Sequence, residues 1–318
     1  MLAYILRRFL YAVPIALGVS VVCFSLVYLA PGDPLQTVLP ADASAETIAL
    51  VKKEYGFDKP IPVQYALWLG RVLQGDFGVS VSTRRPVVEE VLGALSNTLT
   101  LAMFAVPIAF AIGAALGAVA GWFPGRFIDR AVTGVAVMGV SVPNYWLGIV
   151  LVIIFAVELT MLPATGMGPG GSADFSIWHW SSAQHLVLPV ITLAMVPVGI
   201  ISRSTRAAVA EVRNLDFVTT LRAKGLGEAA VFRHVLKNAL PPVLAVMGLQ
   251  FGYLLGGSIL IETVFSWPGS GFLLSKSITN RDIPVLQGSI LLLAMVFVLT
   301  NLVVDLMQSA IDPRIRRA

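Results

Sequence analysis

Charged residues are scarce in this sequence, and long apolar runs are frequent. Only 13% of its 318 residues are Asp, Glu, Lys or Arg, whereas 57% are apolar. An ordinary soluble domain carries roughly 25% charged residues. Several apolar runs reach the ~20 residues with which a helix crosses a bilayer. The composition therefore excludes an ordinary soluble protein and predicts an all-α protein that crosses a membrane several times.

Cysteine and histidine are also scarce. Cys23 is the only cysteine, so no intrachain disulfide can form, and we expect a small buried apolar side chain. The three histidines (His179, His185 and His234) lack the spacing of metal ligands. The sequence also lacks a G-x-x-x-x-G-K-[ST] loop, which cradles nucleotide phosphates. We therefore expect this chain to bind no metal, no cofactor and no ATP of its own.

Six apolar runs are long enough to be transmembrane helices. They cover residues 9–30, 99–122, 132–159, 186–201, 243–265 and 287–309. The first run is longer than the apolar part of a signal peptide, so we expect it to be retained. The fourth is short, and it can extend through Arg203, whose long side chain reaches the headgroups.

Glycine and proline occur inside several of these runs. Gly113 and Gly117 have the small-xxx-small spacing that lets two membrane helices approach closely. The pattern is common, so it predicts close packing without identifying the partner helix. Prolines such as Pro143 are tolerated in membrane helices where neighbouring groups satisfy the freed backbone.

The basic residues are distributed unevenly around the six runs. With the N-terminus inside, fourteen of the 22 Lys and Arg residues fall in segments 1–8, 123–131, 202–242 and 310–318. The short outer loops 160–185 and 266–286 hold only Lys276 and Arg281. Because Lys and Arg concentrate on the cytoplasmic side, we expect both termini and loop 202–242 to be cytoplasmic and 31–98 to be external. The net charge of +4 thus reflects orientation and does not indicate a nucleic-acid partner.

The external segment predicts two short helices. The first covers 44–56, with Ser44 as N-cap and Gly56 at its end. The second begins near residue 63 and ends near Gly75. A segment of this size is too short to be a separate enzyme.

One strongly charged segment, 214–242, separates the fourth and fifth runs. We predict a helix over 214–224, with Asn214 as N-cap and Asp216 in its first turn. Glycines break this helix, and a second helix over 228–240 ends at two prolines. The first helix is expected to expose apolar side chains, as a helix does that fits a groove on another protein. A solvated linker helix on the membrane surface is the alternative.

The same segment resembles the cytoplasmic signature loop of permeases of binding-protein-dependent ABC importers. "RAKGL" at 222–226 and "HVLKNALPP" at 234–242 are similar to the dipeptide, oligopeptide, glutathione and nickel branch. "PGDP" at 31–34, "GDFGVS" at 75–80, "SWPGSG" at 266–271 and "DPRIR" at 312–316 are similar to the same branch. The broader family often begins this loop with Glu-Ala-Ala, where this chain has Thr219, Thr220 and Leu221. No acidic anchor is therefore carried over.

The resemblance implies a type I ABC importer permease, with a core of five helices preceded by one N-terminal helix and an external subdomain. It implies a cytoplasmic N-terminus with the first helix at 1–30, a periplasmic subdomain at 31–93, the transmembrane domain at 94–309 and a cytoplasmic tail at 310–318. The chain would not be an enzyme. It would form half of the pathway of an ATP-driven di- or oligopeptide importer in a bacterial inner membrane, with glutathione or nickel chelates as alternative substrates.

The implied partners are a second, related permease, ATP-binding subunits that hold the ATP, a periplasmic solute-binding protein, and membrane lipid. Loop 202–242 would contain the coupling helix that docks on the ATPase. The implied coupling residues are Leu215, Asp216, Phe217, Val218, Leu221, Arg222, Ala223, Lys224 and Gly225.

Three acidic residues lie inside predicted spans, and Glu158, at the outer end of the third, is expected to lie at the membrane interface. Glu262 is near the outer end of the fifth, and an ionisable residue at membrane depth is a functional candidate by default. Glu262 is therefore a candidate for lining the translocation path, and a packed, hydrogen-bonded acid is the other interpretation. Asp305, in the sixth span, is expected to pair with Arg203 or Arg206.

A stand-alone secondary transporter or an intramembrane enzyme is the alternative of another class. A secondary transporter usually needs intramembrane ion ligands and internal symmetry, and an enzyme needs a paired nucleophile or a metal set. The sequence shows none of these patterns.

Overall fold

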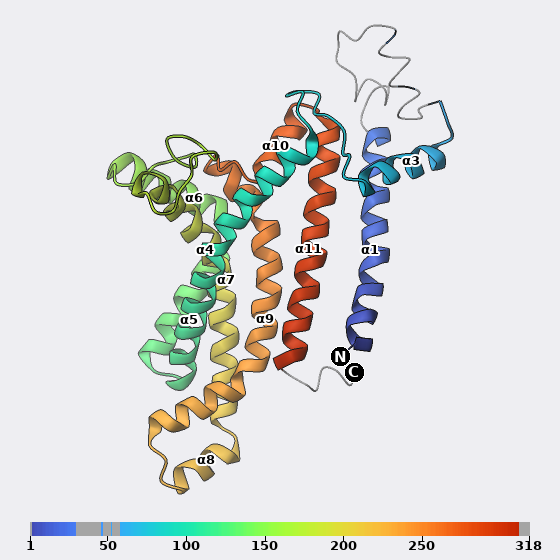
Figure 1. Cartoon of the computed structure of the whole chain (residues 1–318). Coiled ribbons are helices and arrows are strands. Elements are labelled where there is room, and N and C mark those ends of the chain that lie inside the picture. The colour runs from blue at the N-terminus through green and yellow to red at the C-terminus, as the bar shows by residue number, and fades with distance from the viewer. Residues whose placement is uncertain (1, 30–45, 47–51, 53–57, 312–318) are drawn as a thin grey trace. The chain divides into compact units, whose positions relative to one another are not determined.

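The computed structural model describes residues 2–29, 46, 52 and 58–311, and the regular structure in this part of the chain is helical (Figure 1). The elements are α1 (Leu2–Leu29), α3 (Ile61–Leu73), α4 (Val87–Trp122), α5 (Phe127–Ser141), α6 (Asn144–Leu151), the π-helix η2 (Val152–Glu158), α7 (Trp180–Arg213), α8 (Asp216–Ala223), α9 (Glu228–Val264), α10 (Ser270–Thr279) and α11 (Ile283–Ile311). Among these described residues, β pairing is limited to one isolated bridge between Val79 and Pro86. The all-helical prediction is confirmed.

Among the helices in the described part of the chain, three are long and apolar enough to cross a membrane: α4, α7 and the Ile283–Val304 part of α11. Two bent pairs, α5 with Asn144–Glu158 and Glu228–Leu254 with Ser258–Val264, would raise the number of candidate spans to five. In α1 the apolar stretch, Val13–Leu29, is shorter. Five predicted runs thus correspond to candidate spans by length and composition, while a crossing by the first stays a prediction.

The predicted third run, 132–159, is not one straight helix. α5 and the segment that follows it meet at an angle of 99°. Between them, Val142 has extended backbone angles, φ −83° and ψ 128°, because the ring of Pro143 disfavours the helical region for the residue before it. The prediction of a continuous helix is wrong, and Pro143 is where the chain turns.

The predicted fourth run, 186–201, is much shorter than the helix that contains it. α7 has 34 residues and continues well beyond Arg203. Buried positions recur at helical spacing past the end of the apolar run. They are Ser202, Thr205, Ala208 and Val209. Small buried side chains therefore keep α7 packed against neighbouring helices beyond residue 201, where the apolar run ends.

α9 is also longer than predicted, because it passes through Pro241 and Pro242 without ending. A stripe of buried side chains recurs every four residues on both sides of the prolines. Its members are Val231, Val235, Ala239, Val243 and Met247. Each fully buried Val contributes roughly 1.5–3 kcal/mol, so the stripe offsets the ~3 kcal/mol that an interior proline costs. The predicted stop at the prolines is wrong for this reason.

The chain divides into two compact units. The first combines Met1–Thr98 with Pro268–Leu302, and the second combines Leu99–Trp267 with Val303–Ala318. In the first unit α3 packs beside α1. The Gln287 amide of α11 donates a 2.8 Å hydrogen bond to the carbonyl of Cys23 in α1, and Cys23 is fully buried, as predicted.

The predicted external segment is described in part. Apart from Glu46 and Lys52, the helix expected over 44–56 lies outside the described residues. α3 confirms the second predicted helix, since it ends at Leu73 and Gly75 follows with φ +84°. Glycine adopts this left-handed conformation without steric cost.

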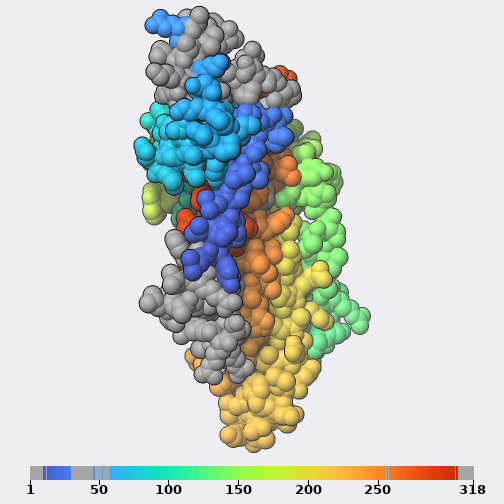
Figure 2. All heavy atoms as spheres, turned by 90° about the vertical axis from the view of Figure 1, so that its right-hand side faces the viewer, coloured from blue at the N-terminus to red at the C-terminus, as the bar shows by residue number. Residues whose placement is uncertain are grey.

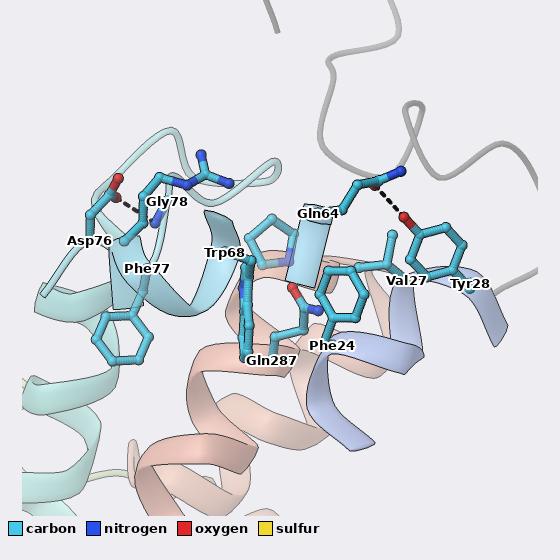
Figure 3. Close-up of a pocket in the computed structure, with 11 residues that line it drawn as sticks. Phe24, Val27, Tyr28, Gln64, Trp68, Asp76, Phe77, Gly78 and Gln287 are labelled. Atoms are coloured by element: carbon cyan, nitrogen blue, oxygen red, sulfur yellow. Dashed lines mark hydrogen bonds between the residues drawn. The ribbon is translucent and has the colours of Figure 1, made fainter. Parts of the chain in front are cut away.

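A small cavity of about 40 Å³ lies among α1, α3 and α11 of the first unit (Figure 3). Phe24, Trp68 and Gln287 converge on it, and the Phe24 and Trp68 ring centroids are 5.7 Å apart. A space of this size holds a few water molecules at most. It is too small to be a peptide site.

In the second unit α7 lies at the centre, since it packs against α5, α6 and α9. α4 reaches it through three glycines spaced four residues apart: Gly113, Gly117 and Gly121. A Cβ atom on Gly117 would lie 2.4 Å from the carbonyl oxygen of Ser202 and 2.6 Å from Cβ of Thr205. The backbones of the two helices are thus in direct contact. The predicted small-xxx-small packing is confirmed, and α7 is the partner.

Gly117→Ala is therefore expected to destabilise the second unit by roughly 1–3 kcal/mol, because the added methyl forces α4 and α7 apart. Gly134→Ala in α5 is the matched control, since nothing lies within 4 Å of a Cβ there. The control should be neutral, or stabilising by up to about 1 kcal/mol through helix propensity. Thermal unfolding of the purified chain in detergent measures both, and equal midpoints would contradict the packing.

Candidate functional site

The first part of the charged segment, residues 214–227, forms a corner between two long helices at one end of the second unit (Figure 1). α7 ends at Arg213, α8 crosses the corner, and α9 begins at Glu228. Figure 2 shows these atoms, in yellow and light orange, gathered at the tip of this unit. We call residues 214–227 the α8 corner.

The start of α8 differs from the prediction by one residue. Asn214 is the last cap of α7, and Leu215, with extended angles of φ −76° and ψ 148°, occupies the N-cap of α8 without a side-chain hydrogen bond. The expected N-cap role of Asn214 is therefore wrong. Asp216 lies in the first turn and Arg222 in the last, where each charge is favourable to the helix dipole.

The end of α8 is a Schellman motif. Gly225 has φ +79°, its amide donates to the Arg222 carbonyl at 2.9 Å, and the Leu226 amide donates to the Leu221 carbonyl at 3.2 Å. This pair of bonds satisfies carbonyls that the helix end would otherwise leave open. Leu221 and Leu226 both pack on the same core cluster, which is the hydrophobic contact that usually accompanies the motif.

One side of α8 is anchored in the core of the second unit. Val218 has no exposed surface, and Phe217 and Leu221 pack with it against the cluster that contains Val209 and Val235. The predicted exposure of Val218 is wrong, because that face of the helix is occupied internally. The other implied coupling residues are exposed. They are Leu215, Asp216, Arg222, Ala223, Lys224 and Gly225.

A fork-shaped ion pair closes the corner. The Arg222 guanidinium donates to the two carboxylate oxygens of Glu228 at 2.8 and 3.2 Å. These hydrogen bonds, together with the positive charges of Arg222 and Arg213, lower the pKa of Glu228. The pair spans the turn from the end of α8 to the first residue of α9 and thereby links the two helices.

Trp122, the last residue of α4, braces the corner from the side. Its ring meets Phe232 of α9 edge to face, with centroids 4.9 Å apart, and the Arg213 guanidinium lies over it at 5.5 Å. Aromatic pairs of this kind contribute ≈ 0.5–1.5 kcal/mol and cation–π contacts about 0.5–1 kcal/mol. The ends of α4, α7 and α9 therefore meet at one side chain.

A second ion pair ties α5 to α7. Arg206 donates to the two oxygens of Asp129 at 2.6 and 2.8 Å, and the Gly125 amide donates to the same carboxylate at 2.8 Å. Arg206 thus pairs with Asp129. This pairing could not be predicted from the sequence, because 77 residues separate the partners. The side chain of Asp305 lies outside the described ones, so its expected pairing with Arg203 or Arg206 stays a prediction.

Glu262 lies in the last turns of α9 and has no exposed surface. Its backbone carbonyl accepts a 2.8 Å bond from the Trp267 amide, and Trp267 is also fully buried. In this conformation the surroundings of Glu262 match a packed acid. Among the described residues, no group of three or more His, Cys, Asp or Glu side chains is placed to hold a metal ion.

Trp122→Ala is expected to loosen the α8 corner without unfolding the chain. Loss of both ring contacts should raise the rate of amide hydrogen exchange in residues 216–223 about tenfold, which corresponds to about 1.4 kcal/mol. Trp178→Ala is the control, because that ring is 88% exposed and lies in a loop of the same unit. Unchanged exchange in Trp122→Ala would show that the corner does not depend on this brace.

Comparisons with known proteins agree along the chain. Residues 113–317 match the family described as binding-protein-dependent transport system inner membrane component, and residues 1–102 match the N-terminal membrane component of such systems. The dipeptide transport system permease protein of Alkalihalophilus pseudofirmus is 42% identical over 332 residues, covering 99% of this chain and 100% of the relative. The glutathione transport system permease proteins of Salmonella typhimurium and Escherichia coli K12 are 43% and 41% identical over 317 residues, covering 99% of each chain.

A solved structure supports the fold. A chain of the MetNI methionine ABC transporter in an inward-facing conformation has a TM-score of 0.51 and 19% identity, covering 71% of this chain and 96% of that one. With a family match over most of the chain and relatives above 40% identity at full length, this chain is a multi-pass membrane protein that belongs to the inner membrane components, or permeases, of binding-protein-dependent ABC transport systems, which are transport proteins and not enzymes.

Proposed function

We propose that this chain forms half of the translocation pathway of an ATP-driven di- or oligopeptide importer in a bacterial inner membrane. The observation that carries this proposal is the α8 corner, which is exposed and charged on one side and anchored in the core on the other. The sequence has no phosphate-binding loop, so the energy must come from a partner. The dipeptide permease relative supports a peptide substrate.

In this proposal the exposed residues of the corner dock on a cytoplasmic ATP-binding subunit. Leu215, which is 48% exposed, and the charged Asp216 and Lys224 form the contact surface. The buried Val218 and its neighbours transfer movement of the corner to α7 and α9. Closure of the ATP-binding subunits would then rock these helices as rigid bodies between two states of the pathway.

The remaining partners follow from the same family. A second, related permease would form the other half of the pathway, and a periplasmic solute-binding protein would deliver the substrate to the subdomain at 31–93. The transmembrane domain would cover 94–309, with both termini and loop 202–242 in the cytoplasm. Glu262 remains a candidate for the path, which requires a state that exposes its buried carboxylate.

Glutathione is a second candidate substrate. Relatives named as glutathione permeases match the chain at 41–43% identity over its full length, as closely as the dipeptide permease does. Glutathione is itself a small peptide, so both substrates offer an amine and carboxylates to the same path. Import of nickel chelates is the third alternative implied by the sequence motifs.

The proposed orientation predicts which sides react with an impermeant thiol reagent. In a chain with Cys23→Ala, a cysteine at the exposed position Thr220 should be labelled only after the membrane is opened, and one at the exposed Lys59 should be labelled from outside. The physical reason is the concentration of basic residues around loop 202–242. Labelling of Thr220→Cys in intact cells would contradict the orientation.

The coupling role is tested at two glycines of the same turn. Gly225 has φ +79° and Gly227 has φ −65°, and nothing lies within 4 Å of a Cβ at either position. Valine is therefore strained only at position 225, by roughly 1–2 kcal/mol or more. Gly225→Val should re-aim α8 and weaken its docking, whereas Gly227→Val fits its extended backbone.

The measurement is ATP hydrolysis by the reconstituted complex, with and without loaded solute-binding protein. We expect stimulation to fall about fivefold or more in Gly225→Val and to stay near wild type in Gly227→Val. Loading the binding protein with a dipeptide or with glutathione in the same assay identifies the substrate. Full stimulation in an assembled Gly225→Val complex would refute the coupling role.

A further inference from the structure

An open hollow of about 510 Å³ lies between α5 and α7 of the second unit. Its lining residues are Thr133, Ile200, Arg203, Ser204 and Arg206. Two arginines and two hydroxyls thus face a space that is far larger than a water site. Neither the α8 corner nor the candidate path residue uses this hollow.

The hollow lies at the depth where both helices change from apolar to polar. In α7 the stretch 186–201 contains one polar residue, Thr192, and Arg203 to Arg206 follow directly after it. In α5 the charged pair Asp129 and Arg130 precedes Thr133, and an apolar stretch follows. In a membrane protein this change marks the level of the lipid headgroups.

The charges in the hollow do not cancel. The bidentate ion pair with Asp129 compensates Arg206. Arg203 is exposed, and no ion pair of its guanidinium is found within the described part of the chain. Among the described side chains, the charge of Arg203 is therefore uncompensated beside two hydroxyls. A guanidinium fork binds the oxygens of a phosphate with two parallel hydrogen bonds.

An apolar surface continues from the hollow along α5. Val137 lies one helical turn from Thr133 on the same face and is 45% exposed, and Ile200 of α7 contributes an apolar wall. A phosphate beside Arg203 would thus be followed by surface suited to an acyl chain. A free inorganic anion would gain nothing from this surface.

We propose that the α5–α7 hollow binds the phosphate headgroup of an anionic phospholipid, with Arg203 as the main contact. Asp129 neutralises Arg206 and holds its side chain in place. Arg206 therefore shapes the hollow and offers hydrogen-bond donors to the headgroup, but it adds little net charge. Basic pockets at the ends of membrane helices are suited to anionic headgroups in this way. The site would stabilise the packing of α5 on α7 in an anionic membrane.

The test uses the purified full-length chain in detergent, with lipid binding followed by native mass spectrometry. Phosphatidylglycerol should bind more tightly than phosphatidylcholine. Arg203→Gln should weaken phosphatidylglycerol binding about fivefold, and Arg203→Lys, which keeps the charge but not the fork, should weaken it less. Arg130→Gln is the matched control, because it removes an exposed arginine of α5 that does not line the hollow.

Three outcomes would overturn the proposal. Equal losses in Arg203→Gln and Arg130→Gln would mean general attraction to a basic surface. Displacement of the lipid by millimolar inorganic phosphate or by a dipeptide would assign the hollow to a free anion or to the substrate. Unchanged binding in Arg203→Gln, with an unfolding midpoint equal to that of wild type, would show that the hollow is not a lipid site.

Discussion

The second unit depends on the contact of α4 with α7 at distances that only glycine allows. Gly117 brings the α4 backbone against the Ser202 carbonyl, and Gly113 and Gly121 repeat this contact one turn away on either side. Apolar side chains gain little from each other in lipid, so close packing of this kind has to hold membrane helices together. α5, α6 and α9 also pack on α7, so α7 is the helix that the rest of the unit shares as a packing partner.

Polar and aromatic contacts then fix the relative orientation of the helices, which backbone packing alone does not determine. The Asp129–Arg206 pair connects α5 with α7, and Trp122 connects the ends of α4, α7 and α9. In the first unit, a 2.6 Å bond from Ser80 to the buried carboxylate of Asp282 fastens the loop after α3 to the start of α11. Each contact joins segments far apart in the sequence and thereby specifies one arrangement of helices.

Features that depend only on residues close together in the sequence could be predicted from residue type. The positive φ of Gly225, the acid in the first turn of α8 and the end of α3 near Gly75 all follow from residue type. Proline shows the limit of such rules. Pro143 breaks a helix, while Pro241 and Pro242 lie inside one, and the difference is the buried stripe of α9.

Contacts between segments that are far apart in the sequence could not be predicted, because they depend on how the whole chain folds. Nothing near Arg206 in the sequence points to Asp129, and nothing in the amphipathic pattern of α8 says that Val218 meets the unit's own core. A single chain shows which side chains are apolar, but the partner that covers them depends on the whole fold. The coupling role of this segment stays a prediction, and the structure corrects only the face of α8 that was expected to be exposed.

The Schellman motif at Gly225 has a consequence for the entropy of association. A free helix of eight residues is marginal in water, and a partner that bound it would have to order it first. The α8 corner is already ordered by its own hydrogen bonds, the Arg222–Glu228 pair and the buried Val218. If the proposed partner docks here, only surface side chains would be immobilised, at roughly 0.5–1.5 kcal/mol each. Such a preordered corner could be released and bound again without unfolding, so a small interface would be sufficient.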